Sequence, residues 1–322
     1  MLIFFTIQMI RVLVENTNWM CDGTFKIAPS LFFQIYTIHA LVRDNLVPCI
    51  YVLLPDKSRQ TYAEMWRQIL QPQSIQIDFE AAARSAIQDI FPNTQVRGCF
   101  FYLGQSLYRR VLQDGLKVQY EEDTVTRRFV NMLMAIAFLP EDEISDAIDD
   151  IREHNDYPNH LDPIYDYFED TYVGRRIRNR RRAPLFAVNM WSVRIRTAQG
   201  LARTNNQLEA WHGAWQGAVG SSHPSFFRFL DVLQREQRLQ EANLRQIRQG
   251  RDLVKHLKKY EAVNRRLQRI IEGDRLFGDD CSQSRNQCGL NVAVFTWSLF
   301  TRLLFTWSLY VLYMVAILRS PF

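Results

Sequence analysis

The stretch SIQIDFEAAARSAIQDIF, residues 74–91, contains the two patterns that decide the fold class. Residues 74–80 alternate between apolar and polar side chains, as a half-buried strand does, and the segment that follows has the spacing of an amphipathic helix that stops before Pro92. Asp78 stands where the strand ends. A strand, an acid and a helix in this order predict one edge of a sheet in an α/β protein, where clefts form.

Further strands lie on both sides of this stretch. Runs rich in β-branched and aromatic residues predict strands at 31–42, 48–54 and 95–102, while residues 61–70 have helical spacing. Residues 1–14 are apolar and are interpreted as the beginning of a first strand, which ends with Asp22 beside Gly23. We therefore expect an α/β protein with a mixed five-stranded sheet flanked by helices.

The strand pattern stops near residue 104. The next ninety or so residues carry apolar side chains at helical spacing, which is too long a stretch for a loop. We predict five segments: a first part of the core at 1–104, a helical insertion at 105–195, a final core helix at 196–225, a basic helical extension at 226–278 and an apolar tail at 279–322.

Asp22 and Asp78 both follow predicted strand ends, and a third acid from a helix would complete an oxygen-rich metal site. The stretch RTNNQLEAWH, Arg203 to His212, supplies Glu209 in the first turn of a helix that Asn206 would cap. Three carboxylates repel each other unless cations neutralise them, and hard oxygen ligands suit Mg²⁺ or Mn²⁺. Two such metals can drive phosphodiester cleavage. Residue types alone leave a plainer alternative, in which Glu209 only serves the start of its helix.

Five segments, in this order, resemble the transposases of Mutator-like elements, the MULE group. They are DGTFKIAP from Asp22, IQIDFEAAARSAI from Ile75, GCFFYLGQSLYRRV from Gly98, RTNNQLEAWH from Arg203 and SSHPSFFRFLDVLQREQ from Ser221. The resemblance implies an RNase H-like fold with an all-helical insertion between the second and third acids. It also implies a DDE site in which Asp22, Asp78 and Glu209 bind Mg²⁺ or Mn²⁺, with double-stranded DNA, both transposon ends and target, as the partner.

The chain departs from the family pattern at one position. Where the family has a cysteine and, three residues later, a histidine, this chain has Cys99 and Tyr102. A tyrosine can donate a hydrogen bond but is not a base near neutral pH. The resemblance suggests the following residues as supports of the site: Cys99, Tyr102, Arg203, Asn205, Asn206 and His212. The local alternatives are burial for Cys99, capping for the asparagines and packing for His212.

Basic side chains point to a polyanionic partner more by their distribution than by their number. The chain has 39 Lys and Arg against 34 Asp and Glu, a net charge of +5. Six arginines crowd into one short segment and are predicted to contact DNA phosphates. They are Arg175, Arg176, Arg178, Arg180, Arg181 and Arg182. A second basic stretch runs from Arg228 to Arg269, and a solvated surface is the alternative for both.

The ends of the chain differ from its middle. Between Asn291 and Leu318 the only charged residue is Arg302, so this segment is long and apolar enough for a transmembrane helix. FTWSL occurs twice within it, which favours a duplicated or mis-joined segment as the alternative. The five cysteines have no repeating spacing, which indicates a reduced compartment without a disulfide framework.

Two classes of function remain after this reading. The first is a transposase catalytic domain that acts in the nucleus, cleaves DNA and transfers strands. The second is an inactive, transposon-derived DNA-binding or structural protein, anchored to a membrane if the tail is genuine. No zinc-finger spacing precedes the catalytic segments, so we expect a shortened copy. The sequence leaves open whether the chain forms a homo-oligomer.

Overall fold

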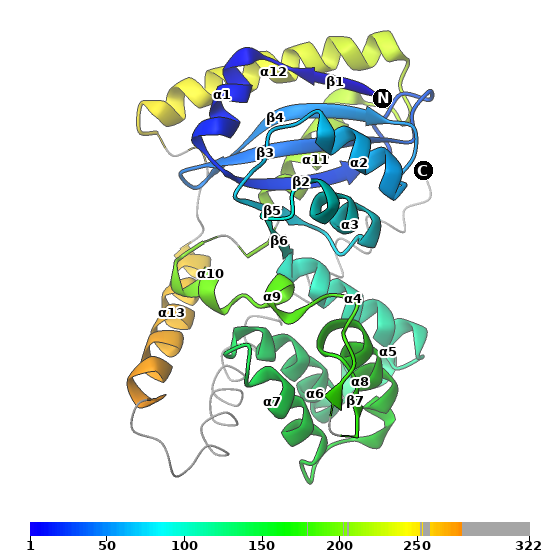
Figure 1. Cartoon of the computed structure of the whole chain (residues 1–322), viewed down its shortest axis with the longest axis vertical. Helices are drawn as coiled ribbons and strands as arrows, with labels where there is room; N and C mark the ends of the chain where they lie inside the picture. Colours follow the sequence, from blue (N-terminus) through cyan, green and yellow to red (C-terminus); the bar gives the residue numbers. More distant parts are fainter. Residues whose placement is uncertain (179, 202, 205, 252, 254–257, 279–322) are drawn as a thin grey trace. The chain divides into compact units, whose positions relative to one another are not determined.

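The chain folds as two compact units. The computed structural model describes residues 1–278 except 179, 202, 205, 252 and 254–257. The first unit contains Met1–Cys99 and Thr204–Leu257, and the second contains Phe100–Arg203 and the helix α13 (Lys258–Gly278). Figure 1 gives the labels used below.

The first unit is built on a six-stranded mixed sheet in the order β1-β4-β3-β2-β5-β6. Neighbours from β1 to β2 are antiparallel, whereas β5 runs parallel to both β2 and β6. The strands are β1 (Leu2–Phe5), β2 (Asn18–Thr24), β3 (Gln34–Val42), β4 (Asn45–Leu54), β5 (Ser74–Ile77) and β6 (Gln95–Gly98). The predicted α/β class with a mixed sheet flanked by helices is confirmed, and the arrangement is compatible with an RNase H-like fold.

The prediction of one long first strand was wrong, because a helix interrupts it. The strand β1 is short, and α1 (Ile7–Glu15) follows directly. The side chain of Thr6 accepts a hydrogen bond from the backbone N–H of Met9 and so caps the helix. Met9, Val12 and Leu13 are buried at helical spacing. The separate strands β1 and β2 explain why the sheet has six strands and not five.

The strand predicted at residues 95–102 is also shorter than expected. β6 ends at Gly98, and α4 (Phe100–Gln113) begins two residues later. Phe100, Leu103, Leu107 and Val111 are buried, and their spacing of three and four residues suits a helix and not a strand. The apolar run therefore contains the end of one element and the beginning of the next.

Helices cover both faces of the sheet (Figure 1). The helices α2 (Arg59–Arg67) and α3 (Ala81–Ile90) lie on one face, where Tyr36 of β3 contacts Tyr62 and Trp66. The helices α11 (Asn206–Val219) and α12 (Phe226–Arg248) lie on the other, where Thr37 of β3 contacts His212. Alternate residues of β3 thus point to opposite helical layers.

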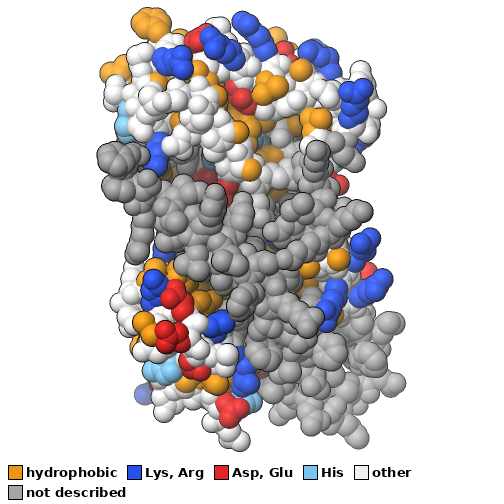
Figure 2. Space-filling view, turned by 180° about the vertical axis from the view of Figure 1, so that it is seen from behind, with side chains coloured by type: hydrophobic (Ala, Val, Ile, Leu, Met, Phe, Trp, Pro, Cys, Tyr) orange, Lys and Arg blue, Asp and Glu red, His pale blue; other side chains and the backbone are white. Residues whose placement is uncertain are grey.

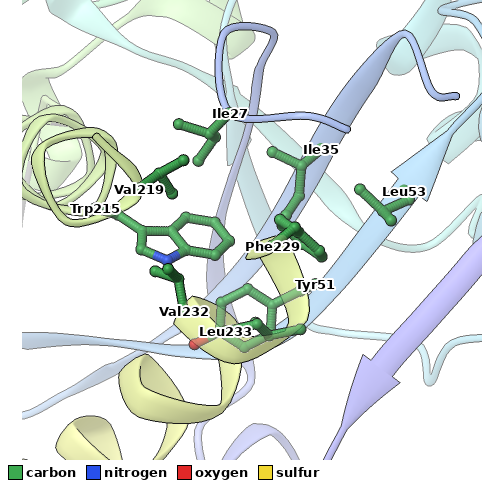
Figure 3. Packing of buried hydrophobic residues seen from close by; sticks show 9 residues of the cluster. All are labelled: Ile27, Ile35, Tyr51, Leu53, Trp215, Val219, Phe229, Val232 and Leu233. Atoms are coloured by element: carbon green, nitrogen blue, oxygen red, sulfur yellow. The ribbon is translucent and has the colours of Figure 1, made fainter. Parts of the chain in front are cut away.

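The core of the first unit fixes α11 against the sheet (Figure 3). Trp215 of α11 is 1 % exposed and lies between the sheet and α12, with ring centroids 5.4 Å from Tyr51 and 5.9 Å from Phe229. The complete cluster is Ile27, Ile35, Tyr51, Leu53, Trp215, Val219, Phe229, Val232 and Leu233. Burial of these side chains positions the helix that also carries Glu209 and His212.

The second unit is mainly helical, with one short hairpin that the predicted all-helical insertion did not include. Its hairpin joins β7 (Arg176–Ile177) to β8 (Arg180–Arg181). The α-helices after α4 are α5 (Lys117–Glu122), α6 (Thr124–Ala135), α7 (Ile144–Arg152), α8 (Asp162–Phe168), α9 (Val188–Trp191), α10 (Arg194–Ala198) and α13. Short 3₁₀ turns occur at Ile136–Phe138 and Asn159–Leu161, and a π-helical turn at Glu169–Val173.

The basic extension predicted at 226–278 forms two helices that belong to different units, α12 in the first and α13 in the second. Within the described residues, no helix has both the length and the apolar content that a bilayer crossing needs. The tail predicted at 279–322, including the apolar segment 291–318, lies outside the residues that the structure describes.

Candidate functional site

Asp22 lies on β2, and Asp78 directly follows β5, the parallel neighbour of β2. The register of β2 and β5 pairs Trp19 with Ile75 and Met20 with Gln76. Extended two residues further, past the end of β5 at Ile77, this register would set Asp22 beside Asp78. Adjacent strands are about 4.8 Å apart. The fold thus brings together two acids that are distant in the sequence.

Burial and neighbouring acids raise the pKa of Asp78 and of Glu80 at this strand edge. Burial, followed by the charges of Asp22 and Glu80, raises the pKa of the Asp78 carboxyl to about 7. Burial is also the main cause that raises the pKa of Glu80, and the charge of Asp22 adds to it. Buried carboxylates that repel each other are stabilised by a bound cation. These oxygen donors are of the kind that a divalent metal takes.

The carboxylate of Asp22 has a polar neighbour at each of its oxygens. Its Oδ1 accepts a hydrogen bond of 2.8 Å from the backbone N–H of Gly23. Its Oδ2 lies 3.6 Å from Nδ1 of His212 on α11. Gly23 is required here because a Cβ atom would collide with Oε1 of Gln34, a buried side chain that donates to Tyr62.

Glu209 lies in the first turn of α11, as predicted, and is partly buried. It is three residues before His212, so the two side chains share a face of the helix. Within the described part of the chain, no group of three or more His, Cys, Asp or Glu side chains is assembled closely enough to hold a metal ion. The structure thus joins Asp22 to Asp78 and to His212, without a complete set of three ligands.

The predicted supporting residues divide between the two units. Cys99 is a buried free thiol that follows β6, and its N–H donates to the carbonyl oxygen of Ile77. Tyr102 is on α4 of the second unit, where its ring contacts Phe101. Asn206 is the first residue of α11, and Asn205 lies outside the described residues.

Arg203 is held within the second unit. Its guanidinium donates to Oδ1 of Asn264 at 2.5 Å and to the hydroxyl of Thr197 at 3.5 Å, and it lies over the ring of Phe138. Burial lowers the pKa of Arg203 to about 10. These contacts make Arg203 part of the packing of its own unit.

Three polar residues of the site were not predicted from the sequence. Glu80 follows Asp78 by two residues and accepts a hydrogen bond of 3.2 Å from the hydroxyl of Tyr62. Thr37 and His39 are fully buried on β3. The sequence does contain a signal for the last two, because they alternate with apolar residues in a strand that is otherwise hydrophobic. Two polar positions on one face of a buried strand indicate polar partners on that face.

Only part of the arginine segment is free for a partner. Arg181 donates to Glu169 and Asp149, Arg176 donates to Asp149, and Arg175 donates to Asp170. No acidic side chain in the described residues pairs with Arg178, Arg180 or Arg182, which are exposed. Arg175, Arg176 and Arg181 therefore form ion pairs within the second unit. Arg178, Arg180 and Arg182 are available for an anionic partner.

The turn that carries these free arginines is a defined structure. Arg178 has a positive φ of 54° at the tip of the β7–β8 hairpin. Gly174, before the hairpin, has a φ of 95°, and a Cβ atom there would collide with the carbonyl oxygen of Arg182. Over the described atoms of the face in Figure 2, Lys and Arg side chains are scattered among other types and form no continuous basic band. DNA contact is therefore better sought at particular arginines than across a whole face.

The raised pKa of Asp78 predicts how stability depends on pH when no metal is bound. The folded protein keeps a proton on Asp78 up to pH of about 7, whereas the unfolded chain releases it near pH 4. Metal-free stability should therefore fall as the pH rises from about 4 to about 7, by up to about 4 kcal/mol.

Asp78→Asn should remove this loss, so the variant should melt at a higher temperature than the parent at pH 8 and near the same temperature at pH 4. Thermal unfolding in EDTA, followed by circular dichroism at both pH values, measures the difference. If the melting temperatures of the variant and the parent differ by the same amount at pH 4 and at pH 8, the raised pKa of Asp78 is contradicted.

Comparison with known proteins gave a match to one family model. No curated protein matches the chain. A family model described as the MULE transposase domain matches residues 18–106, a segment that contains Asp22, Asp78, Cys99 and Tyr102 and ends before Glu209. The resemblance seen in the sequence is therefore confirmed over this segment, where residues 18–106 match the MULE transposase domain.

Proposed function

We propose that the chain is the catalytic domain of a DNA transposase that cleaves phosphodiester bonds and transfers strands with two divalent cations, Mg²⁺ or Mn²⁺. Asp22, Asp78 and Glu209 would hold the cations. The observation that carries the proposal is the pair of partly buried carboxylates at two adjacent parallel strands, Asp22 on β2 and Asp78 directly after β5, inside a segment that matches the MULE transposase domain. Double-stranded DNA is the proposed substrate, and nuclear access is then required.

The residues of the site would divide the work as follows. Bound divalent cations stabilise the entering and leaving oxygens of an in-line displacement and lower the pKa of the attacking water. Asp22 and Asp78 supply negative charge from a rigid sheet, so their position changes little when substrate binds. Glu209 approaches from α11, which the core around Trp215 fixes to the sheet. DNA would have to lie with a phosphate at this strand edge.

A second candidate function is an inactive, transposon-derived protein that only binds DNA or has a structural role. Two observations favour it: tyrosine occupies position 102, where the family pattern has histidine, and three ligands are not assembled in the described residues. In that case Asp22, Asp78 and Glu209 would be retained from an active ancestor and would catalyse no reaction. The two candidates make opposite predictions for one assay.

The assay is nicking of supercoiled plasmid by the full chain in Mg²⁺ or Mn²⁺, compared with EDTA. A transposase domain should nick the plasmid only with metal. Salt-dependent binding to duplex DNA without nicking in either metal would overturn the proposed catalysis and support the second candidate. The variants that connect nicking to the acids are considered in the Discussion.

Contact with the DNA backbone is proposed for Arg178, Arg180 and Arg182. The triple change of these residues to alanine should weaken duplex binding to unrelated sequences and reduce the slope of log K against log salt by about 1 for each phosphate that is no longer bound. Fluorescence anisotropy with a labelled duplex at several salt concentrations measures both effects. The melting temperature should stay the same, because these side chains are exposed.

The matched control changes Arg175, Arg176 and Arg181 to alanine, which removes the same charge from the same segment. This variant should lose stability, because Arg181 pairs with the buried Glu169. If both triple variants bind DNA with the parent's salt slope, the hairpin does not contact DNA.

A further inference from the structure

A chain of buried polar contacts runs from the sheet to Asp22. On β3, Nε2 of His39 lies 2.9 Å from the hydroxyl oxygen of Thr37. The same oxygen lies 3.2 Å from Nε2 of His212 and 3.3 Å from the backbone carbonyl oxygen of Asp22. Nδ1 of His212 then faces Oδ2 of Asp22 at 3.6 Å. His212 thus has a partner on each ring nitrogen.

His39 anchors this chain of contacts. Burial, with the charge of His212, lowers the pKa of His39 well below its usual value, so the ring is neutral and carries one N–H. Its Nδ1 is buried with no hydrogen-bond partner among the described residues. An unpartnered N–H would cost more than an unpartnered acceptor, which places the hydrogen on Nε2. His39 therefore donates to Thr37, and the Thr37 hydroxyl can donate to Nε2 of His212, which places the hydrogen of that ring on Nδ1, facing Asp22.

The surroundings of His212 restrict its ring to this arrangement. The side chains of His212 and Asp22 are 11 % and 12 % exposed. The adjacent Trp211 is fixed by its Nε1, which donates to Oε1 of Glu236 at 2.6 Å, and by edge contact with the ring of His39.

We propose that His212 is a positioning residue that fixes the Asp22 carboxylate for metal binding, with Thr37 and His39 fixing His212 in turn. The inference rests on the proposed function, because it takes Asp22 to be a metal ligand. The N–H of Gly23 holds one oxygen of Asp22 and His212 faces the other, so the carboxylate rotamer is set before a cation arrives. Partners of this kind typically change metal affinity 10- to 100-fold when they are removed.

Three substitutions separate the two sides of the ring. His212→Asn keeps an amide at the position of Nδ1, facing Asp22, whereas His212→Gln places its amide nearer to the position of Nε2, facing Thr37. His212→Ala removes both. Mn²⁺ binding to the full chain is measured by electron paramagnetic resonance. Alanine and glutamine should weaken Mn²⁺ binding about 10-fold or more, and asparagine should stay within about 3-fold of the parent.

The control is His223→Asn in the same unit, where the histidine faces the carbonyl oxygen of Ala28 and not an acid. It should bind Mn²⁺ as the parent does. Unchanged Mn²⁺ binding by His212→Ala would overturn the positioning role and leave the proposed function standing. A parent chain that binds no Mn²⁺ would overturn the proposed function.

A metal-free measurement tests the His212 contact independently of that result. In ¹⁵N spectra recorded without metal, Asp22→Asn should shift the ring nitrogen signals of His212 and leave those of His223 unchanged. Unshifted His212 signals would show that the ring is not coupled to Asp22, and would overturn the proposal whether or not the chain binds metal.

Discussion

Asp78→Asn in the full chain should abolish metal-dependent nicking of duplex DNA. Asparagine keeps the shape of the side chain but removes the charge that holds a cation beside Asp22. Metal ions contribute several kcal/mol of transition-state stabilisation, which corresponds to a loss of roughly 10³-fold or more. The rate of plasmid nicking in Mg²⁺ and in Mn²⁺ measures the effect, and Asp22→Asn should show a loss of similar size.

The control for this prediction is Asp89→Asn. Asp89 lies on α3 of the same unit, and its exposed carboxylate pairs with Arg59 outside the site. The variant should nick DNA at the parent rate, since an exposed ion pair contributes little to stability. Full activity of Asp78→Asn beside an active parent would show that the cleavage takes place elsewhere in the chain.

Glu209→Gln decides the identity of the third acid in the same assay. Glu209 is on the sheet-facing helix near His212, whereas Glu80 is the acid whose charge acts on Asp78 in the folded chain. If Glu209→Gln retains activity and Glu80→Gln does not, the third ligand is Glu80 and the family correspondence at Glu209 fails. If the reverse holds, Glu209 is the third ligand.

The sequence was sufficient to predict the acids on the sheet, because local patterns determine them. Alternation along residues 74–80 places the strand and its end, and the parallel register of β2 and β5 follows from an α/β order of elements. Helix and strand were confused only at short apolar runs. At residues 1–14 and 95–102 each run contained two elements, and hydrophobicity alone does not show where one stops.

The partners of charged and polar residues could not be predicted, because they come from distant parts of the chain. The six arginines between Arg175 and Arg182 look equivalent in the sequence. In the structure, Arg181 is paired with Asp149 and Glu169, while Arg178 has no acidic partner in the described residues. His212 similarly contacts Thr37, 175 positions away in the sequence. Tertiary structure, and not local composition, divides these residues into structural and available groups.

Trp215→Ala should be the most destabilising single change in the first unit, and it should also disable the site. The indole is 1 % exposed and packs on Tyr51, Trp211 and Phe229. Loss of a buried Trp costs about 3–5 kcal/mol, which is a large part of the stability of a typical domain. Because α11 carries Glu209 and His212, its loosening should weaken Mn²⁺ binding as well. Urea unfolding followed by circular dichroism measures the stability.

Two variants test whether packing is the cause. Trp215→Phe should cost much less than the alanine change, since it keeps the aromatic contacts and removes an indole N–H that has no partner in the described structure. Phe227→Ala, on the adjacent helix α12, removes an aromatic ring that is 82 % exposed and should change stability by no more than about 0.5 kcal/mol. If Trp215→Ala unfolds at the parent's urea concentration, α11 is not fixed by this core, and Glu209 and His212 lose the rigid support on which their proposed roles depend.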